Sequence, residues 1–462
     1  MRRTMNTATS HPKTENRLLL SLMLPILAEQ ILRSFMGTAN TFMLSRISDE
    51  ASAAVGVSNQ ILNVVIITAT MIGSGASTLI NQYLGAKKKR EAAHIIMNSL
   101  MVSTLVGLFF SLAISALAAQ ILGLVGLEEG LMNDAAIYLR IVGASCVIQF
   151  ISSAISAYFR CYQKPVVAML VIVCTNLMNL AGSWAVVSGM FAGQMMQGVG
   201  GIARVRLVSE LIGLALSMMM LMRQDWDLQI VDMVRLKKEY VTQILRLGFM
   251  SGAEGICYYT AQLVTTGFIT SFPSQVLSAK VYVQTVNNYT YLAGQSVGLA
   301  SQIMTGHMIG AGEKDRAYGF VKKSWLYVLS CNICFSLLFF VCSRQIIGIF
   351  TDSEEILSIA RMLFFIDIFT CLGRSLNHSF NLGLRSAGYV FWPMIIAASS
   401  IWTFQCGLGY LASIGLHLGI IGIWIAQTVD EWFRGLCAMR LWLGKKWMKM
   451  DVVKERREGE KE

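Results

Sequence analysis

RLLLSLMLPILAEQILRSF, residues 17–35, is apolar enough to cross a membrane as a helix, yet it contains Glu29 and, one helical turn later, Arg33. A second stretch, LRLGFMSGAEGICYYT at residues 245–260, places Glu254 in similar surroundings. The two glutamates are 225 positions apart (254 − 29). Because an ionised side chain is costly within lipid, each is expected to face a cavity or a partner rather than the hydrocarbon.

The composition indicates that this chain is embedded in a lipid bilayer. Hydrophobic types make up 55% of the 462 residues and charged types only 14%, and the mean hydropathy is +0.56; a soluble protein carries about 25% charged residues. Apolar runs of about 20 residues, long enough to cross the hydrocarbon as helices, recur along the chain. The predicted spans are 18–45, 53–83, 95–122, 135–159, 165–188, 202–222, 244–270, 277–306, 324–343, 361–384, 390–413 and 418–443. Since every backbone amide must be hydrogen-bonded within lipid, the predicted fold is an all-α polytopic membrane protein with twelve transmembrane helices.

The net charge of +11 is a signal of topology rather than of nucleic-acid binding. Lys and Arg gather in alternate connections, for example at 87–90, at 235–238 and after Lys445, whereas the other connections carry acids such as Glu128. By the positive-inside rule, both termini and the 223–243 loop lie in the cytoplasm of a multi-pass cell-membrane protein. The first span is not followed by a small-residue cleavage site, so it is expected to be retained.

A shift of about 225 positions aligns one half of the sequence with the other. The matched positions are Glu29/Glu254, Asn63/Asn288, Gly85/Gly310, Ala92/Ala317, Arg160/Arg385 and, at a slightly smaller shift, Glu210/Glu431. Two six-span halves in the same orientation are an architecture of transporters, with the substrate path between the halves. The period is far too long for a solenoid. The predicted division is a cytoplasmic tail over 1–17, an N-lobe over 18–222, a loop over 223–243, a C-lobe over 244–445 and a basic tail over 446–462.

No pattern in the sequence indicates an enzyme, a cofactor or a metal centre. Most of the ten cysteines lie inside predicted spans, and the CxxC of Cys331 and Cys334 has no further ligand in its apolar helix, so packing is the better interpretation. The histidines show no HExxH spacing, and no phosphate loop, nucleophile elbow or GxGxxG motif is present. We therefore expect no catalytic residues, no bound metal and no cofactor.

Four segments together resemble the multidrug and toxic compound extrusion (MATE) transporters. They are LPILAEQILRSFMGTANTFMLSRISDEASAAVGV (24–57), GSGASTLINQYLGAKKKREA (73–92), GQSVGLASQIMTGHMIGAGEKDRA (294–317) and NLGLRSAGYVFWPM (381–394). The resemblance covers roughly residues 18–445 and lies in the order, duplication and spacing of these segments. It implies a twelve-helix, two-lobed antiporter that exports cationic or amphipathic compounds and is driven by sodium or protons.

This chain departs from the family pattern at four acids. Asn40, in GTANTF, stands where the first span of relatives usually has an aspartate, and Ser183, four residues after Asn179, replaces the acid of an Asn-x-x-x-Asp pair. Tyr258 and Arg374 occupy the positions of a span-7 glutamate and a span-10 aspartate that bind the cation in the NorM-type branch. The coupling mechanism therefore cannot be carried over. The chain resembles a less typical branch with a glutamate earlier in spans 1 and 7.

The candidates for cation coupling are Glu29, Glu254, Asp367 and Arg374. Glu29 and Arg33 lie four residues apart on one helical face and can neutralise each other, either as a structural or as a functional pair. Glu254 has only Cys257 and Tyr258 about one turn away. An unpaired carboxyl there is desolvated, which disfavours its charged form and lets it bind and release a proton near neutral pH. The alternative is a permanent pair with a base from another helix.

Span 10 supplies a candidate base. A polar stripe at spacings of 7, 4 and 3 runs down one face of this helix to line the lumen and consists of Asp367, Arg374, His378 and Asn381. We expect the fixed charge of Arg374 to replace the metal as partner to Glu254 or Asp367, which favours protons over sodium as the coupling ion. Lys280 either joins this cluster or, as the favoured alternative, snorkels to the outer interface.

The substrate is indicated only by residue types. The 27 methionines and many aromatic residues suit an adaptable apolar cavity for amphipathic ligands, although packing accounts for most of them. The candidates for lining this cavity are Asn40, Asn179, Gln149, Tyr258, Lys280, His378 and Asn381. Within span 12, Asp430, Glu431 and Arg434 are interpreted as an internal ion pair, with Glu210 as the N-lobe analogue.

The predicted function is a cation-coupled antiporter that exports cationic or amphipathic drugs by alternating access of its two lobes. Its expected partners are small amphipathic molecules and the lipid bilayer, without nucleic acid, and it is expected to be a monomer. A flippase for lipid-linked precursors shares this architecture and would need a wider, more cationic cavity, so it is the alternative. A membrane-embedded enzyme would need His, Cys or acidic residues clustered at one membrane face, which the sequence does not indicate.

Overall fold

The computed structural model describes residues 12–124, 129–190, 197–224, 236–450 and 452–453, and these parts are almost entirely helical. The long helices of the first half are α1 (Pro12–Ser45), α2 (Asp49–Gly85), α3 (Lys89–Leu124), α4 (Glu129–Ala144), α5 (Cys146–Cys161), α6 (Pro165–Val187) and α7 (Gly198–Met222). The second half comprises α9 (Lys238–Ile269), α10 (Ser274–Gly310), α11 (Lys314–Val341), α12 (Ser343–Ile347), α13 (Glu354–Leu376), η2 (Asn377–Asn381), α14 (Leu382–Ser386), α15 (Phe391–Ser400), η3 (Ile401–Leu408), η4 (Leu411–Gly415), α16 (Gly419–Leu443) and η5 (Lys446–Lys449). Each of the twelve predicted spans coincides with one helix or one consecutive group of helices, which confirms the predicted all-α membrane fold. Parts of the predicted tails and of the 223–243 loop lie outside the described residues.

Length and apolar composition alone identify fewer spans than the fold contains. Eight helices of the described chain are long and apolar enough to cross a membrane, or nine if α4 and α5, which are bent by 45° relative to each other, form one span. The three remaining passes are α9, α10 and α16. Each contains charged residues within its run, among them Glu254, Lys280 and Glu431. Hydropathy alone therefore misses three of the helices that carry internal charges.

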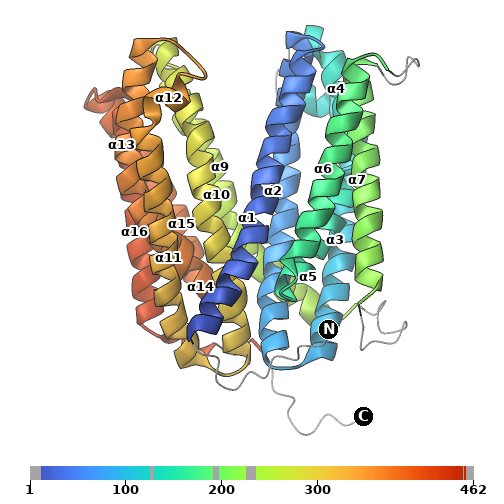
Figure 1. Cartoon of the computed structure of the whole chain (residues 1–462), viewed down its shortest axis with the longest axis vertical. Helices are drawn as coiled ribbons and strands as arrows, with labels where there is room; N and C mark the ends of the chain where they lie inside the picture. The colour runs from blue at the N-terminus through green and yellow to red at the C-terminus, as the bar shows by residue number, and fades with distance from the viewer. Residues whose placement is uncertain (1–11, 125–128, 191–196, 225–235, 451, 454–462) are drawn as a thin grey trace.

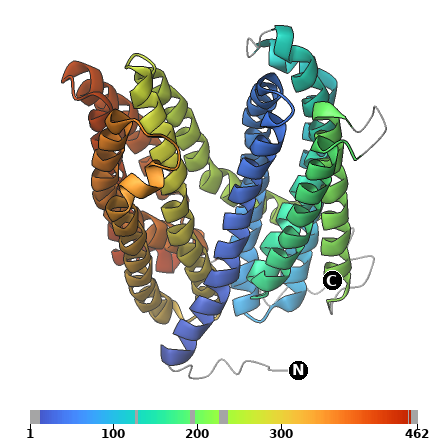
Figure 2. The same ribbon diagram turned by 45° about the horizontal axis from the view of Figure 1, so that its top comes forward.

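The helices form two groups that diverge toward one end of the molecule and converge at the other (Figure 1). Helices α2 to α7 belong to one group, and α10 to α16 belong to the other. The same separation at the upper end is visible after a turn of 45° (Figure 2). Large apolar side chains remain exposed along both groups, among them Leu24, Phe109 and Leu263, as expected of a surface that contacts lipid rather than water.

The first helix of each half packs in both halves. Leu19 and Ile26, near the start of α1, belong to a buried apolar cluster with α10, α11 and α16. Ile244 of α9, which lies 225 positions after Leu19 (244 − 19), belongs in turn to the buried cluster of α2 to α7. Further along α1, the Leu32 carbonyl accepts a hydrogen bond from Asn176 of α6 at 3.1 Å. The first part of each of these helices thus packs in the opposite half. The lobe boundaries predicted at residues 18 and 244 therefore stay a prediction.

The two halves meet where α2 crosses α10 at near backbone contact. A Cβ atom on Gly85 would lie 2.1 Å from the carbonyl oxygen of His307, and one on Gly310 would lie 1.9 Å from that of Gln82. A side chain at either position would overlap main-chain atoms that cannot move aside cheaply. The contact is reciprocal, since a shift of 225 carries Gly85 onto Gly310 and Gln82 onto His307. The halves are thus related by an approximate twofold axis through this crossing, as parallel repeats are.

Among the hydrogen bonds that join the halves beside this crossing, two are related by the repeat. Gln82 of α2 donates to the Ser386 carbonyl of α14 at 2.6 Å. Nε2 of His307 on α10 lies 2.9 Å from the Cys161 carbonyl of α5. These contacts are equivalent under the repeat, because Ser386 follows Cys161 by 225 positions (386 − 161). We call the α2–α10 crossing together with these two bonds the vertex.

Candidate functional site

Glu29 lies in the middle of α1, buried between two arginines. Nη2 of Arg33, one turn further along the helix, is 3.3 Å from Glu29 Oε1, which confirms the predicted i, i+4 pair. Arg160, at the end of α5, donates from Nη1 to the same oxygen at 2.8 Å. The other oxygen, Oε2, is buried and has no hydrogen-bond partner among the described residues. The carboxylate is thus held from its own helix and from span 4.

Glu254 has the corresponding place in α9 and is ion-paired through both carboxylate oxygens. Arg385 of α14 donates from Nη2 to Oε2, and Arg434 of α16 donates from Nη1 to Oε1 at 3.1 Å. Asn381 of η2 also donates to Oε2, at 3.1 Å. The expectation of an unpaired carboxyl at Glu254 is therefore wrong. The alternative interpretation, a pair with bases from other helices, is confirmed.

One arginine of each glutamate site is related to the other by the internal repeat. Glu29 pairs with Arg160 and Glu254 pairs with Arg385, and one shift of 225 relates both partners (254 − 29 and 385 − 160). The repeat thus preserves an ion pair between the first and fourth spans of each half. The sequence contained this signal in the alignment of Arg160 with Arg385, but spacing along one helix cannot reveal a contact between helices.

The second arginine of each site has a different origin. In the first half it is Arg33, on the same helix as the glutamate. In the second half the position 225 residues after Arg33 is Tyr258 (258 − 33), and Arg434 from α16 takes the place of the missing base. Span 12 therefore contributes to the glutamate site of the second half, whereas no described residue of α7 pairs with Glu29.

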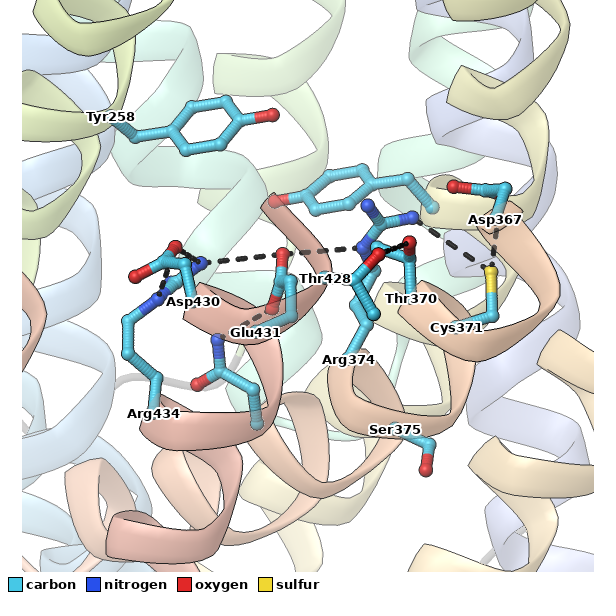
Figure 3. Close-up of polar contacts among 12 residues, drawn as sticks. Tyr258, Asp367, Thr370, Cys371, Arg374, Ser375, Thr428, Asp430, Glu431 and Arg434 are labelled. Atoms are coloured by element: carbon cyan, nitrogen blue, oxygen red, sulfur yellow. Dashed lines mark hydrogen bonds and ion pairs between the residues drawn. The ribbon is translucent and has the colours of Figure 1, made fainter. Parts of the chain in front are cut away.

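A row of polar side chains connects α16 with α13 (Figure 3). Its members, all buried, are in order Asp430, Arg434, Glu431, Arg374, Cys371 and Asp367. Within α16, Arg434 is 2.8 Å from Asp430 and 3.3 Å from Glu431, which confirms the predicted internal ion pair. Between the helices, Arg374 Nε donates to Glu431 Oε1 at 3.4 Å. At the end of the row, Asp367 accepts from a neutral group: the Cys371 thiol donates to Asp367 Oδ2 at 3.4 Å. The same thiol accepts from Arg374 Nη1 at 3.9 Å.

The prediction that Arg374 pairs with Glu254 is wrong. The guanidinium of Arg374 binds Glu431, and Glu254 is reached instead by Arg434, which lies on the other side of Glu431. The reason is the position of α16 between α13 and α9, which spacing along span 10 cannot reveal. The described hydrogen bonds join Arg374 to Asp367 only through the Cys371 thiol.

A second contact also recurs in both halves. Gln149 of α5 donates to Glu210 of α7 at 3.2 Å, and Arg374 of α13 donates to Glu431 of α16 at 3.4 Å. Gln149 and Arg374 are 225 positions apart (374 − 149). Arg206, four residues before Glu210, pairs with it at 3.1 Å. The fourth and sixth spans of each half are thus joined at equivalent positions, through an amide in one half and a guanidinium in the other.

A protein-family model for MatE matches the chain twice, over residues 25–185 and 251–411. The chain belongs to the MatE family. The two matched segments begin 226 positions apart (251 − 25), which agrees with the predicted duplication and with the repeated ion pairs.

Curated relatives of this MatE protein match over nearly its whole length. The uncharacterized transporter YisQ of Bacillus subtilis is 35% identical over 453 residues, which cover 97% of this chain and 98% of that one. The probable multidrug resistance protein NorM of Thermotoga maritima is 25% identical and covers 95% of this chain and 94% of its own. The probable multidrug resistance protein YoeA of Bacillus subtilis is also 25% identical, over 409 residues.

Solved MATE structures share the fold at low identity. A mutant of the Vibrio cholerae MATE transporter VcmN aligns with a TM-score of 0.86 at 16% identity and covers 94% of this chain and 97% of its own. A MOP superfamily transporter from Pyrococcus furiosus aligns with a TM-score of 0.83 at 17% identity, over 93% of this chain and 96% of its own. The fold is therefore that of a multi-pass membrane transporter of this family.

The remaining residues that were predicted to line a cavity in this MatE protein lie in different places. Lys280 is buried, with 6% of its surface exposed, and donates to the Thr266 hydroxyl, so the prediction that it snorkels is wrong. The His378 ring lies 5.0 Å from the Tyr291 ring, and the Tyr258 hydroxyl accepts from Gln262 at 3.0 Å. These aromatic residues border the Glu254 site from α9, α10 and η2.

In the first half, Ser183 and Asn40 stand where relatives have acids, and neither takes part in a described ion pair. The Ser183 hydroxyl lies 3.4 Å from Asn179 Oδ1 in α6. Asn40 Oδ1 is buried without a hydrogen-bond partner in the described chain. Among the described residues, no group of three or more His, Cys, Asp or Glu side chains could hold a metal ion.

Proposed function

We propose that this MatE protein is a secondary active exporter of amphipathic small molecules, including cationic drugs. Relatives named as probable multidrug resistance proteins support an exporter of this kind. The observation that carries the proposal is the duplicated pair Glu29–Arg160 and Glu254–Arg385. The glutamate of each pair lies on a helix whose first part packs in the opposite half, so a movement of the halves acts on both pairs.

The proposed coupling ion is the proton, and the proposed site is Asp367. The acids of the C-half cluster are Glu254, Asp367, Asp430 and Glu431, and its arginines are Arg374, Arg385 and Arg434. Three of these acids accept a direct arginine contact, whereas the described contact of Asp367 is a thiol. An acid in excess of its bases, buried in a membrane protein, is the one that neutralises most readily by taking up a proton.

Protonation of Asp367 can act on the distant helix α9 through the row of charges. A negative Asp367 attracts Arg374 toward Cys371, whereas a neutral Asp367 leaves Arg374 to Glu431. Arg434 pairs with both Glu431 and Glu254. When Glu431 binds Arg374 more strongly, it therefore binds Arg434 more weakly. The proton is thereby linked to the ion pair of α9, the helix that packs in both halves.

The proposed movement is alternating access by rocking of the halves, in which the vertex is the gate at the end where they converge. Basic residues lie near the end where the halves converge, for example Lys87, two residues after the end of α2, and Lys314 at the start of α11. If this end is cytoplasmic, as the positive-inside rule predicts, the structure is open to the outside. Export then requires the vertex to part, the substrate to enter from the cytoplasm and the vertex to close again.

Gradient-driven efflux of ethidium from proteoliposomes tests this function. With the membrane potential clamped, we expect an imposed pH gradient to drive efflux by the parent and by Asp352→Asn, an exposed control between α12 and α13. Asp367→Asn is expected to lose the response to the pH gradient. Stimulation by sodium alone would contradict the proton assignment, and lipid flipping without ethidium efflux would favour a flippase instead.

A further inference from the structure

The guanidinium of Arg33 has donors to spare. It makes one described contact, to Glu29 Oε1 at 3.3 Å, and it shares that oxygen with Arg160. A guanidinium has five N–H donors in a planar fork that matches a carboxylate. We propose that Arg33 binds the acid group of an amphipathic substrate, so that carboxylate-bearing amphiphiles are preferred cargo. The inference rests on the proposed function, because it takes the bound molecule to be the exported one.

Arg33 is accessible on the side of α1 that does not face lipid. Its side chain is 54% exposed. The exposed apolar residues of this helix include Leu24, Ile31 and Phe35, and at 3.6 residues per turn Arg33 lies about 180° to 200° around the helix from each of them. An exposed charge on the face opposite the lipid-facing one is expected to contact water or ligand between the halves.

Contacts of its neighbours place Arg33 at the boundary between the halves. Gln30, three residues before it, donates to Ser296 of α10 at 2.8 Å. Ser34, the next residue, accepts from Asn288 of α10 at 3.1 Å. α10 belongs to the second half, so both contacts cross from one half to the other. A ligand on Arg33 would therefore lie where transport requires it, within reach of both halves.

The second half provides an internal comparison. Arg434 takes the role of Arg33 there, but its side chain is only 6% exposed and it binds Glu254, Asp430 and Glu431. Its donors are occupied by three acids, whereas Arg33 and Arg160 divide a single carboxylate. The positive charge in excess is thus found in the first half, on the more exposed arginine, and this asymmetry indicates an anionic group in the ligand rather than a structural pair.

Helix α10, which contacts α1 beside Arg33, offers an aromatic side chain to the apolar remainder of such a ligand. Tyr291 of α10, one turn after Asn288, is 38% exposed and lies beside the His378 ring. Its hydroxyl accepts from Gln295 at 2.9 Å. An exposed aromatic side chain on α10, the helix that contacts α1 beside Arg33, suits a molecule that carries a carboxylate on an aromatic or aliphatic body.

A matched pair of fluorescent probes tests this preference. Tetramethylrhodamine carries a free carboxylate, and its methyl ester has the same ring system without that charge. Binding to the purified protein in detergent is measured by fluorescence anisotropy. We expect the parent to bind the acid more tightly than the ester, and Arg33→Gln to weaken binding of the acid by about tenfold or more while leaving the ester unchanged.

Two further variants separate a specific role from a structural one. Arg33→Lys keeps the charge but loses the fork, so it should recover part of the affinity for the acid. Arg344→Gln removes a 74% exposed arginine that pairs with Glu354 and should change neither probe's affinity.

The inference is overturned if the parent binds both probes alike, if it binds neither, or if Arg33→Gln weakens both equally. Efflux of the two probes from proteoliposomes under a pH gradient keeps this test apart from that of the proposed function. Equal efflux of acid and ester would refute only the acid preference. Binding that favours the acid, without gradient-driven efflux of either probe, would refute the exporter.

Discussion

A single carboxylate, that of Glu254, neutralises two arginines that come from different helices, α14 and α16. Glu254→Gln leaves Arg385 with no acid within the described contacts and removes one of the acids that Arg434 binds. Because removing one partner strands a buried charge, we expect the protein to lose about 3 kcal/mol of stability. Thermal unfolding in detergent measures this loss, with Glu354→Gln on the exposed Arg344 pair as the control that changes little. An unchanged midpoint for Glu254→Gln would contradict the pairing.

Residue spacing predicts contacts within one helix and fails for contacts between helices. The Glu29–Arg33 pair and the Asp430–Arg434 pair were predictable because four residues make one turn. The partners of Glu254 were not, since they depend on how α14 and α16 pack against α9. Only the repeat offered an indirect signal, in the alignment of Arg160 with Arg385.

Helix crossing depends on glycines that the sequence presents as ordinary members of a repeat. Gly85 and Gly56 both lie in α2, but a Cβ on Gly85 would lie 2.1 Å from the His307 carbonyl, whereas a Cβ on Gly56 would meet nothing within 4 Å. Gly85→Ala is expected to destabilise the closed vertex by about 1 to 3 kcal/mol through overpacking. Gly56→Ala should instead stabilise the helix by roughly 0.5 to 1 kcal/mol. Thermal unfolding of both variants decides this, and equal shifts would contradict the backbone contact.

Element positions follow from the sequence more fully than element shapes do. All twelve spans were predictable from apolar runs, including α9, α10 and α16, although the charges of these three lower their hydropathy. The 45° bend between α4 and α5 and the π-helical turn η2 were not predictable. Both depend on tertiary packing and leave no glycine or proline at the bend itself, where Ser145 stands, or within η2.

The whole molecule is held at its vertex by two equivalent hydrogen bonds, and this predicts which substitution there is tolerated. His307 and Gln82 are related by the repeat, and each contacts a carbonyl of the other half. His307→Gln makes both positions glutamine and should preserve ethidium efflux, because an amide can donate to Cys161 as Gln82 donates to Ser386. His307→Leu leaves that buried carbonyl unpaired and should slow efflux several-fold. Similar losses in the two variants would contradict a hydrogen-bonding role.

At the same scale, the sequence predicts a duplicated transporter but not the exchange of helix segments between its halves. Leu19 and Ile244 look like residues of their own lobes, yet each packs in the core of the opposite one. Hydropathy and repeat spacing carry no information on which half covers an apolar face, so the link between the halves is visible only in the fold.

Proton release on ligand binding tests most directly whether Asp367 carries the coupling proton. Purified protein in weakly buffered detergent solution is mixed with ethidium, and the pH change is followed with a soluble indicator dye. Antiport predicts that the parent releases protons as ethidium binds and that Asp367→Asn binds ethidium without releasing any. The same release from Asp367→Asn as from the parent, or binding to the parent without any release, would contradict it.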